Sequence, residues 1–251
     1  DKACADKPII MSSNDGHNNL LNTKAMEMCG ITKDSKAPTG GKIARDKDGN
    51  PNGWLTDAAE LITLEEEFTT DEVAEGVDKF FKDMNSWGYT SCSSAGAMTE
   101  SSEGVSANDI IINKAKADGG LPLRLALSNI ISQDTVDQNF SDLEALKAKC
   151  GDTEDVTVTT AKFFIDGVVE GMTAYLSKPY SKKSIKDYNL SKGYKSEPMW
   201  EMDAYKEAML RACKEGYQIH VHSVGDAATT MTVDAIEYAQ ENAGGEDYRN
   251  I

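Results

Sequence analysis

At residues 218–228 the chain reads QIHVHSVGDAA, a short apolar run that carries two histidines and stops at a Gly-Asp pair. Residues i and i+2 of a β-strand face the same side, so the imidazoles of His220 and His222 are expected to point one way. The pair predicts a strand whose end carries metal-binding or acid–base chemistry, because imidazole is the commonest metal ligand. Two packed or surface histidines are the alternative interpretation.

Outward from this strand, helix and strand patterns alternate from about residue 70 onward, which is typical of an α/β fold. Thr70 is expected to cap the first helix, with Asp71 and Glu72 in its first turn. A polar stretch at 167–199 predicts a long loop that is either functional or partly disordered. The expected helices are 70–87, 108–116, 134–149, 201–214 and 227–242, and the expected strands are 89–93, 121–128, 156–165 and 218–223.

The first 69 residues do not follow this alternation. Residues 8–12 are expected to form a strand, and 18–29 a helix that ends at Gly30. The Asp-Gly pair at 48–49 lies between two short runs and predicts a β-hairpin. We therefore divide the chain into an inserted α+β cap at 1–69 and an α/β domain at 70–251.

Lys162 lies among apolar residues of the expected strand at 156–165. Lost hydration lowers the pKa of such a lysine and makes the neutral amine available. The amine can then act as a general base, form a Schiff base, or add carbon dioxide to give a carbamate, an oxygen ligand for metals. A lysine that faces solvent at the strand edge is the alternative. Asp166, four residues on, is expected on the same face.

Asp15 and His17 follow the first expected strand in the motif DGHN. An Asx-type turn explains Asp15 and Asn18 without a function, whereas His17 is less easily explained in this way. The sequence has no Gly-x-Ser-x-Gly elbow, no Gly-x-Gly-x-x-Gly motif and no P-loop. Neither a serine triad of that type nor nucleotide binding is therefore supported.

The chain of 251 residues carries a formal net charge of −16. No nucleic acid and no membrane are expected as partners, because nucleic acid requires a basic face and anionic lipid repels an acidic protein. The five cysteines are scattered without a Cys-x-x-Cys pair, which predicts no disulfide framework and a reduced, cytoplasmic compartment. We interpret the chain as an internal part of a longer protein, which leaves open a secretion signal upstream.

Several motifs, taken in order, resemble the amidohydrolase superfamily, specifically the amidohydrolase-3 or YtcJ-like metal-dependent hydrolases. Their order and spacing span nearly the whole chain, which makes the resemblance more specific than any single motif. The motifs are DGH at 15–17, NTKAM at 22–26, GIT at 30–32, GGKI at 40–43, GNPNG at 49–53, GYTS at 88–91, KFFIDG at 162–167, PYS at 179–181 and HSVGDAA at 222–228.

The resemblance implies a partial TIM-like (β/α)8 barrel, about strands 2–5, with the inserted cap. In related enzymes a lysine in the position of Lys162 is carboxylated and bridges two divalent metals, and a histidine in the position of His222 is a metal ligand. The implied cofactor is a divalent metal, zinc by default, and the implied substrates are small molecules with amide-type C–N bonds. Asp15, His17 and Asp166 would shape or contact the substrate pocket, and His220 would be a packed neighbour.

The same resemblance implies that the family's remaining metal ligands lie outside residues 1–251. We therefore expect no complete catalytic set here, an inactive fragment and no metal bound by the fragment alone, since a stable zinc site needs three or four protein ligands. A non-catalytic relative that binds or senses a small molecule is the alternative, because fold does not fix activity. The unpaired edges of a half barrel predict either association between copies of the chain or a partly rearranged sheet in the isolated fragment.

Overall fold

The computed structural model describes residues 1–14, 16–38, 41–64, 68–96, 103–117, 119–188 and 190–244. Its contacts divide the chain into two compact units, which we describe separately. The first unit comprises Asp1–Glu65, Phe164–Glu201 and His222–Asp234, and the second comprises Glu66–Phe163, Met202–Val221 and Ala235–Ile251. The predicted division at residues 69–70 remains a prediction.

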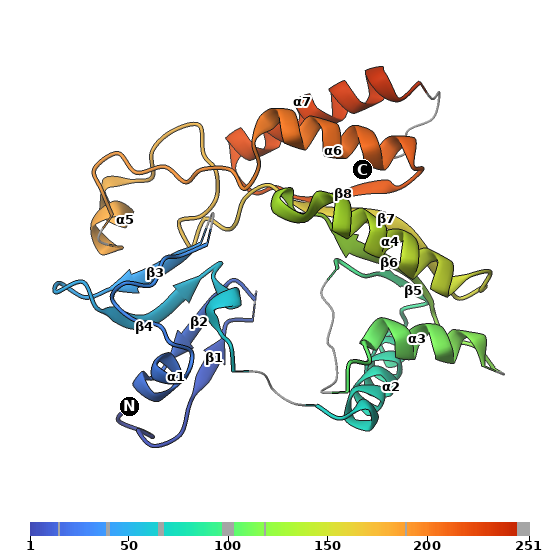
Figure 1. Cartoon of the computed structure of the whole chain (residues 1–251), viewed down its shortest axis with the longest axis horizontal. Helices are drawn as coiled ribbons and strands as arrows, with labels where there is room; N and C mark the ends of the chain where they lie inside the picture. The colour runs from blue at the N-terminus through green and yellow to red at the C-terminus, as the bar shows by residue number, and fades with distance from the viewer. Residues whose placement is uncertain are drawn as a thin grey trace. The chain divides into compact units, whose positions relative to one another are not determined.

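The first unit is built on a four-stranded antiparallel sheet in the order β1-β2-β4-β3 (Figure 1). Helix α1, Thr23–Met28, begins after Asn22, whose side chain accepts a hydrogen bond from the backbone N–H of Ala25. A buried cluster of Leu21, Ala25, Ile31, Leu55 and Ala58 joins this helix to the sheet. The strands are β1 Ile10–Ser12, β2 Asn18–Leu21, β3 Lys42–Arg45 and β4 Pro51–Thr56, and a short 3-10 helix η1 spans Ala59–Leu61.

The helix predicted over residues 18–29 is wrong in its first part, because residues 18–21 form strand β2. This segment pairs with β1 on one side and with β4 on the other. Asn18 and Asn19 have weak helix propensity, so pairing on both sides outweighs it. The predicted hairpin is confirmed: β3 and β4 pair, and the Asp46 carboxylate accepts hydrogen bonds from the backbone N–H groups of Asp48 and Asn50 in the turn.

The long loop predicted at 167–199 belongs to the first unit and is irregular except for a short helix α5, Lys182–Asp187. Hydrogen bonds to its own carbonyl groups hold it in place. The Tyr188 hydroxyl donates to the carbonyl of Glu170 at 2.6 Å, and the Tyr194 hydroxyl donates to the carbonyl of Met172 at 3.1 Å. Helix α7, Asp226–Ala243, begins in this unit.

The second unit contains a curved sheet in the order β5-β6-β7-β8, with helices along it (Figure 1). The pairs β5–β6 and β6–β7 are parallel, as the helix–strand alternation predicted. The strands are β5 Ser91–Ser93, β6 Arg124–Ile130, β7 Val156–Phe164 and β8 Gln218–His222, and the helices are α2 Thr70–Ser86, α3 Ala107–Lys116, α4 Val136–Cys150 after the 3-10 helix η2 Gln133–Thr135, and α6 Met202–Lys214.

Helix α2 shows how local sequence sets these elements. Thr69, and not Thr70 as predicted, caps the helix: its side chain accepts from the backbone N–H of Glu72, whose carboxylate accepts from the backbone N–H of Thr69. This reciprocal capping box satisfies two helix N–H groups. Val73, Val77 and Phe81 then recur on one face, and all three are buried.

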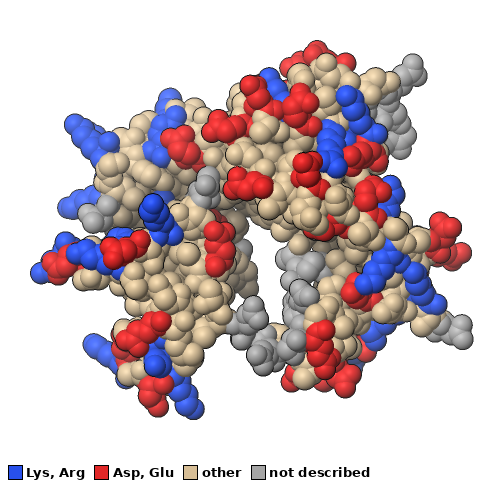
Figure 2. Space-filling view, in the orientation of Figure 1, with Lys and Arg blue, Asp and Glu red and all other residues tan. Residues whose placement is uncertain are grey.

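In the view of Figure 2, acidic and basic side chains are interspersed. Among the described residues, no helix has both the length and the apolar character required to span a membrane.

Candidate functional site

The register of the antiparallel sheet brings His17 and Asp57 together. Asn18 pairs with Thr56, so His17 and Asp57 lie just beyond the paired ends of strands β2 and β4. The backbone N–H of Asp57 donates to the carbonyl of His17 at 2.8 Å, and His17 Nδ1 lies 2.6 Å from Asp57 Oδ1. Because a carboxylate only accepts hydrogen bonds, Nδ1 carries the proton.

His222 lies at the end of β8 and belongs to the same unit as His17. Its ring centroid is 5.2 Å from that of His17 and 5.2 Å from that of Phe164. His222 Nε2 is 3.1 Å from the carbonyl oxygen of Gly167, which can only accept, so Nε2 is the donor. In the neutral ring this leaves Nδ1 as the nitrogen with a lone pair.

Asp166 is fully buried and receives three backbone hydrogen bonds. Its carboxylate accepts from the N–H of Val224 at 2.9 Å, of Gly225 at 2.7 Å and of Tyr175 at 2.8 Å. These bonds tie the segment after β8 to the loop at residue 175. The predicted contact of Asp166 with substrate remains a prediction, and the structure shows that this carboxylate orders the backbone around His222.

Lys162 lies in β7 within the second unit and is buried, with 4% of its surface exposed. The alternative of a solvent-facing lysine is therefore wrong. Burial lowers the pKa of its amine, as expected for a lysine among apolar side chains. Its Cγ lies close to Gly96, where a Cβ would be 3.6 Å away.

The other predicted residues have different outcomes. His220 is exposed, so the expectation of a packed neighbour is wrong. That expectation came from the family resemblance, whereas the structure places His220 in the middle of β8 with its side chain exposed. Asp15 lies outside the described residues. The structure therefore places His17, Asp166 and His222 in one unit and Lys162 in the other.

His222 and Lys162 are of chemical types that suit a divalent metal. Within the described residues, however, too few such ligands lie together to form a closed metal site. Metal-binding histidines characteristically donate their second N–H to a carbonyl or a carboxylate, as His222 does to Gly167. A buried lysine with a lowered pKa suits carbamate formation. Among residues that the structure describes, no group of three or more His, Cys, Asp or Glu side chains is arranged to hold a metal ion.

Beside Asp57, strand β3 contributes Lys42 to a cavity of about 490 Å³. Its amine donates to the carbonyl of Met172 at 2.6 Å and lies 4.3 Å from the ring centre of Tyr194. Burial lowers the pKa of Lys42 to about 8, and the nearby Asp57 carboxylate opposes part of this effect. Trp54 and Tyr188 also line the cavity, which thus combines aromatic side chains with two basic ones, Lys42 and Arg45.

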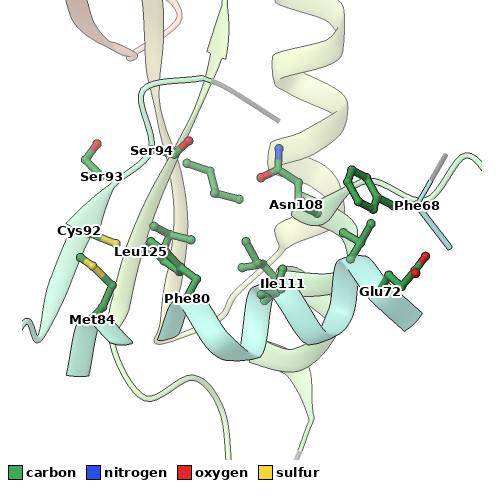
Figure 3. Close-up of a pocket in the computed structure, with 15 residues that line it drawn as sticks. Phe68, Glu72, Phe80, Met84, Cys92, Ser93, Ser94, Asn108, Ile111 and Leu125 are labelled. Carbon is green, nitrogen blue, oxygen red and sulfur yellow. The ribbon is translucent and has the colours of Figure 1, made fainter. Parts of the chain in front are cut away.

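A larger cavity of about 640 Å³ lies in the second unit between α2, α3 and strands β5 and β6 (Figure 3). Its lining is mainly apolar and includes Phe80, Met84, Ile111 and Leu125. None of the predicted site residues lines it. Size alone therefore does not identify the functional site of this chain.

The model of the amidohydrolase family matches residues 1–251, the whole chain. The chain belongs to the amidohydrolase family. This confirms the resemblance inferred from the sequence motifs.

Known relatives of this amidohydrolase chain differ in their described roles. The putative amidohydrolase YtcJ of Bacillus subtilis (strain 168) is 26% identical over 249 residues, which are 98% of this chain and 44% of YtcJ. The exoenzymes regulatory protein AepA of Pectobacterium carotovorum subsp. carotovorum is 23% identical over 233 residues, 91% of this chain and 46% of AepA. The N-substituted formamide deformylase of Arthrobacter pascens is 22% identical over 255 residues, 98% of this chain and 44% of the deformylase. The chain spans less than half the length of these relatives.

Solved structures show the same fold. An uncharacterized metal-dependent hydrolase from Pyrococcus horikoshii OT3 aligns with a TM-score of 0.58 and 19% identity, covering 92% of this chain and 42% of that one. The likeness confirms an α/β fold with a curled parallel sheet, consistent with part of a TIM-type barrel. The details of the inserted cap remain a prediction.

Two residues of this candidate site were missed by sequence reasoning, Asp57 and Lys42. Asp57 lies 40 residues from His17, and only the pairing of β2 with β4 joins them. The hairpin was predicted, but strand β2 was expected as a helix. The signal that was available is Asp57 itself, a carboxylate directly after the second hairpin strand.

Proposed function

We propose that this chain is part of a metal-dependent amidohydrolase that cleaves amide-type C–N bonds other than peptide bonds. The observation that carries the proposal is the hydrogen bond from His222 Nε2 to the carbonyl of Gly167, at 3.1 Å. It fixes the tautomer that a metal-binding histidine requires, at the end of a strand in a chain of the amidohydrolase family.

Lys162, as its carbamate, and His222 would hold the metal, for which zinc is our proposal. When bound, a divalent metal supplies Lewis acidity, which activates a water molecule as the nucleophile. Burial lowers the pKa of the Lys162 amine, which favours the neutral form, and only a neutral amine adds carbon dioxide. The ring of His222 is held in place by Phe164 and His17, whose ring centroids both lie 5.2 Å away.

Other residues would position and bind the substrate. His17 is our candidate for a direct contact, because its imidazole lies beside the ring of His222. Asp166 shapes the pocket through the backbone, since two of its hydrogen bonds fix the turn at residues 224–225 and the third ties that turn to Tyr175. Asp15 remains a candidate from its motif. The partner of this site is a small amide-type molecule.

Lys162 and His222 supply fewer ligands than a closed zinc site requires. We therefore propose that the chain alone is inactive and that the whole protein completes the ligand set. The test compares metal content and amide hydrolysis, with N-substituted formamides among the substrates, for the whole protein and for residues 1–251. The fragment is expected to hold less than one tightly bound metal per chain; one or more would contradict the proposal.

The decisive variant in the whole protein is Lys162→Ala. We expect it to lose bound metal and to reduce hydrolysis by about 100-fold or more, because a ligand is removed. Lys47→Ala, at an exposed lysine of the hairpin turn, is the matched control and should retain both properties. Unchanged metal content and activity in Lys162→Ala would overturn the assignment.

A second function is a non-catalytic protein that binds a small molecule and kept the fold without the metals. The observation that favours it is the relative described as a regulatory protein, AepA. The same experiment separates the two functions. A whole protein that contains no metal and hydrolyses no amide, yet is stabilised against heat by one of these amides, would support the second.

A further inference from the structure

The cavity of about 490 Å³ in the first unit lies between the antiparallel sheet and the long loop. Strands β3 and β4 contribute Lys42 and Trp54, and the loop contributes Tyr188 and Tyr194. Lys42 pairs with Thr56, and Trp54 precedes Thr56 by two residues, so these three side chains share one face of the sheet. We call this space the aromatic cavity.

The rings of the aromatic cavity are held in place by their polar ends. Trp54 Nε1 donates to the side-chain oxygens of Asn18 and Thr56, both at 3.2 Å. The hydroxyl groups of Tyr188 and Tyr194 donate to backbone carbonyls of the loop. Trp54 and Tyr188 nevertheless remain 41% and 46% exposed. Because their polar groups already have partners, these rings offer a ligand a fixed apolar surface, which lowers the cost of ordering on binding.

The charge of the aromatic cavity is basic. The Lys42 amine lies 4.3 Å from the ring centre of Tyr194, which is part of the cavity wall. It donates to the carbonyls of Gly171 and Met172, and a protonated amine has a third N–H. Lys42 forms no ion pair with a carboxylate of the described residues. The described lining includes a second basic residue, Arg45, and no acidic one, although the chain carries a net charge of −16.

We propose that the aromatic cavity binds a small aromatic carboxylate, whose ring lies against Trp54 and Tyr188 and whose carboxylate accepts the third N–H of Lys42. A cation would be repelled by the two basic residues, and an aliphatic anion would leave the ring surfaces uncovered. The volume suits a molecule with one or two rings, and aromatic walls with few polar groups are typical of small-molecule sites.

The first test measures binding to the whole protein by isothermal titration calorimetry at about pH 7. Burial lowers the pKa of Lys42 to about 8, so its amine is still mainly protonated at this pH. The probes are phenylacetate and phenylacetone, which has the same shape, no charge and no bond that an amidohydrolase cleaves. We expect phenylacetate to bind about tenfold more tightly or better, because its hydrogen bond to Lys42 is charge-assisted. Equal affinities, or no binding of phenylacetate, would overturn the proposal.

The second test assigns the probe to the cavity. Lys42→Met should weaken phenylacetate binding about tenfold or more and leave phenylacetone binding unchanged. Lys47→Met, at an exposed lysine of the hairpin turn, is the matched control and should change neither. A folded Lys42→Met that binds phenylacetate as the wild-type protein does would overturn the proposal.

A third variant tests the ring surface and does not depend on the folding of Lys42→Met. Tyr188→Leu, at a half-exposed position, should weaken both probes about fivefold, because ring contacts are lost. Tyr89→Leu is the matched control, since Tyr89 is 52% exposed and lies outside the cavity lining. Unchanged binding of both probes to Tyr188→Leu would contradict the assigned position of the ring.

The proposal does not depend on the proposed function, because binding is measured without hydrolysis. A bound metal could also attract a carboxylate, so the Lys162→Ala protein is titrated as well and should bind phenylacetate as the wild-type protein does. Loss of binding in a folded Lys162→Ala would place the probe at the proposed metal ligands and overturn the proposal. A protein that binds phenylacetate through Lys42 and hydrolyses no amide would fail the proposed function and support this one.

Discussion

At the scale of single residues, the site depends on carboxylates that act through other groups. Asp166 shows this most clearly, because three backbone N–H groups from two segments converge on it. The Asp57 carboxylate likewise orients a neighbouring group, the imidazole of His17. Residues of this kind orient neighbouring groups, so their substitution is expected to affect stability and geometry together.

Asp166→Asn should lower the free energy of unfolding by about 2–4 kcal/mol. Asparagine offers one acceptor oxygen in place of two, and its NH2 group would face an N–H donor. Urea unfolding measures the change. Asp226→Asn is the matched control: this exposed residue accepts from the backbone N–H of Ser177 and should cost less. Equal effects of the two substitutions would contradict the assigned role of Asp166.

Lys42 should make stability depend on pH between about 8, its pKa in the folded chain, and its ordinary value of 10.5. In this window the unfolded chain binds more protons than the folded chain, so the free energy of unfolding rises with pH. The neutral amine keeps two N–H donors, which match the carbonyls of Gly171 and Met172. The contribution of the neutral Lys42 amine to the free energy of unfolding is therefore absent below about pH 8 and fully present above about pH 10.5.

The measurement is urea unfolding of the wild-type protein and of Lys42→Met at several pH values across this window. Other groups titrate here, so the difference between the two proteins is the informative quantity. Lys47→Met, at an exposed position, serves as the control. If the free energies of unfolding of the wild-type protein and of Lys42→Met changed with pH in the same way, the expected rise with pH from Lys42 would be contradicted.

At the scale of elements, sequence patterns predicted what is determined locally. The strand at 156–165 differs from β7 by one residue, and the helices at 70–87 and 201–214 match α2 and α6 within one residue at each end. The failure at 18–21 has a physical reason. Strand β2 forms because it pairs with β1 and β4 on its two sides. Its sequence NNLL has no alternation of polar and apolar residues that would predict a strand. Asp57 could not be joined to His17 without that strand.

Two glycine substitutions with opposite effects test the packing of elements. Gly76 lies inside helix α2, and a Cβ there would meet no atom within 4 Å. Gly76→Ala should therefore raise the free energy of unfolding by about 0.5–1 kcal/mol, because alanine is the better helix former.

Gly225→Ala, in contrast, should lower the free energy of unfolding by about 2 kcal/mol or more. The new Cβ would lie 1.9 Å from the carbonyl oxygen of Tyr175. Thermal unfolding of both variants gives the comparison. Destabilisation by Gly76→Ala, or a neutral Gly225→Ala, would show that the backbone around that glycine differs from the structure.

At the scale of the whole molecule, strands β5 and β8 are the edges of the parallel sheet. Edge strands present backbone groups that pair readily with another chain, so we expect residues 1–251 to self-associate. The net charge of −16 opposes this association, and added salt should therefore increase it. Light scattering at low and at moderate ionic strength is the measurement, and a monomer under both conditions would contradict the expectation.

The close approach of Gly225 to Tyr175 has a consequence at the level of the gene. Every glycine codon begins with two guanines, and any change to either base encodes a residue with a Cβ or a stop. Each of those residues would place an atom where the Tyr175 carbonyl already lies. Codon 225 should consequently tolerate single-base changes only at its third position, and saturation mutagenesis with a folding reporter should recover glycine alone there.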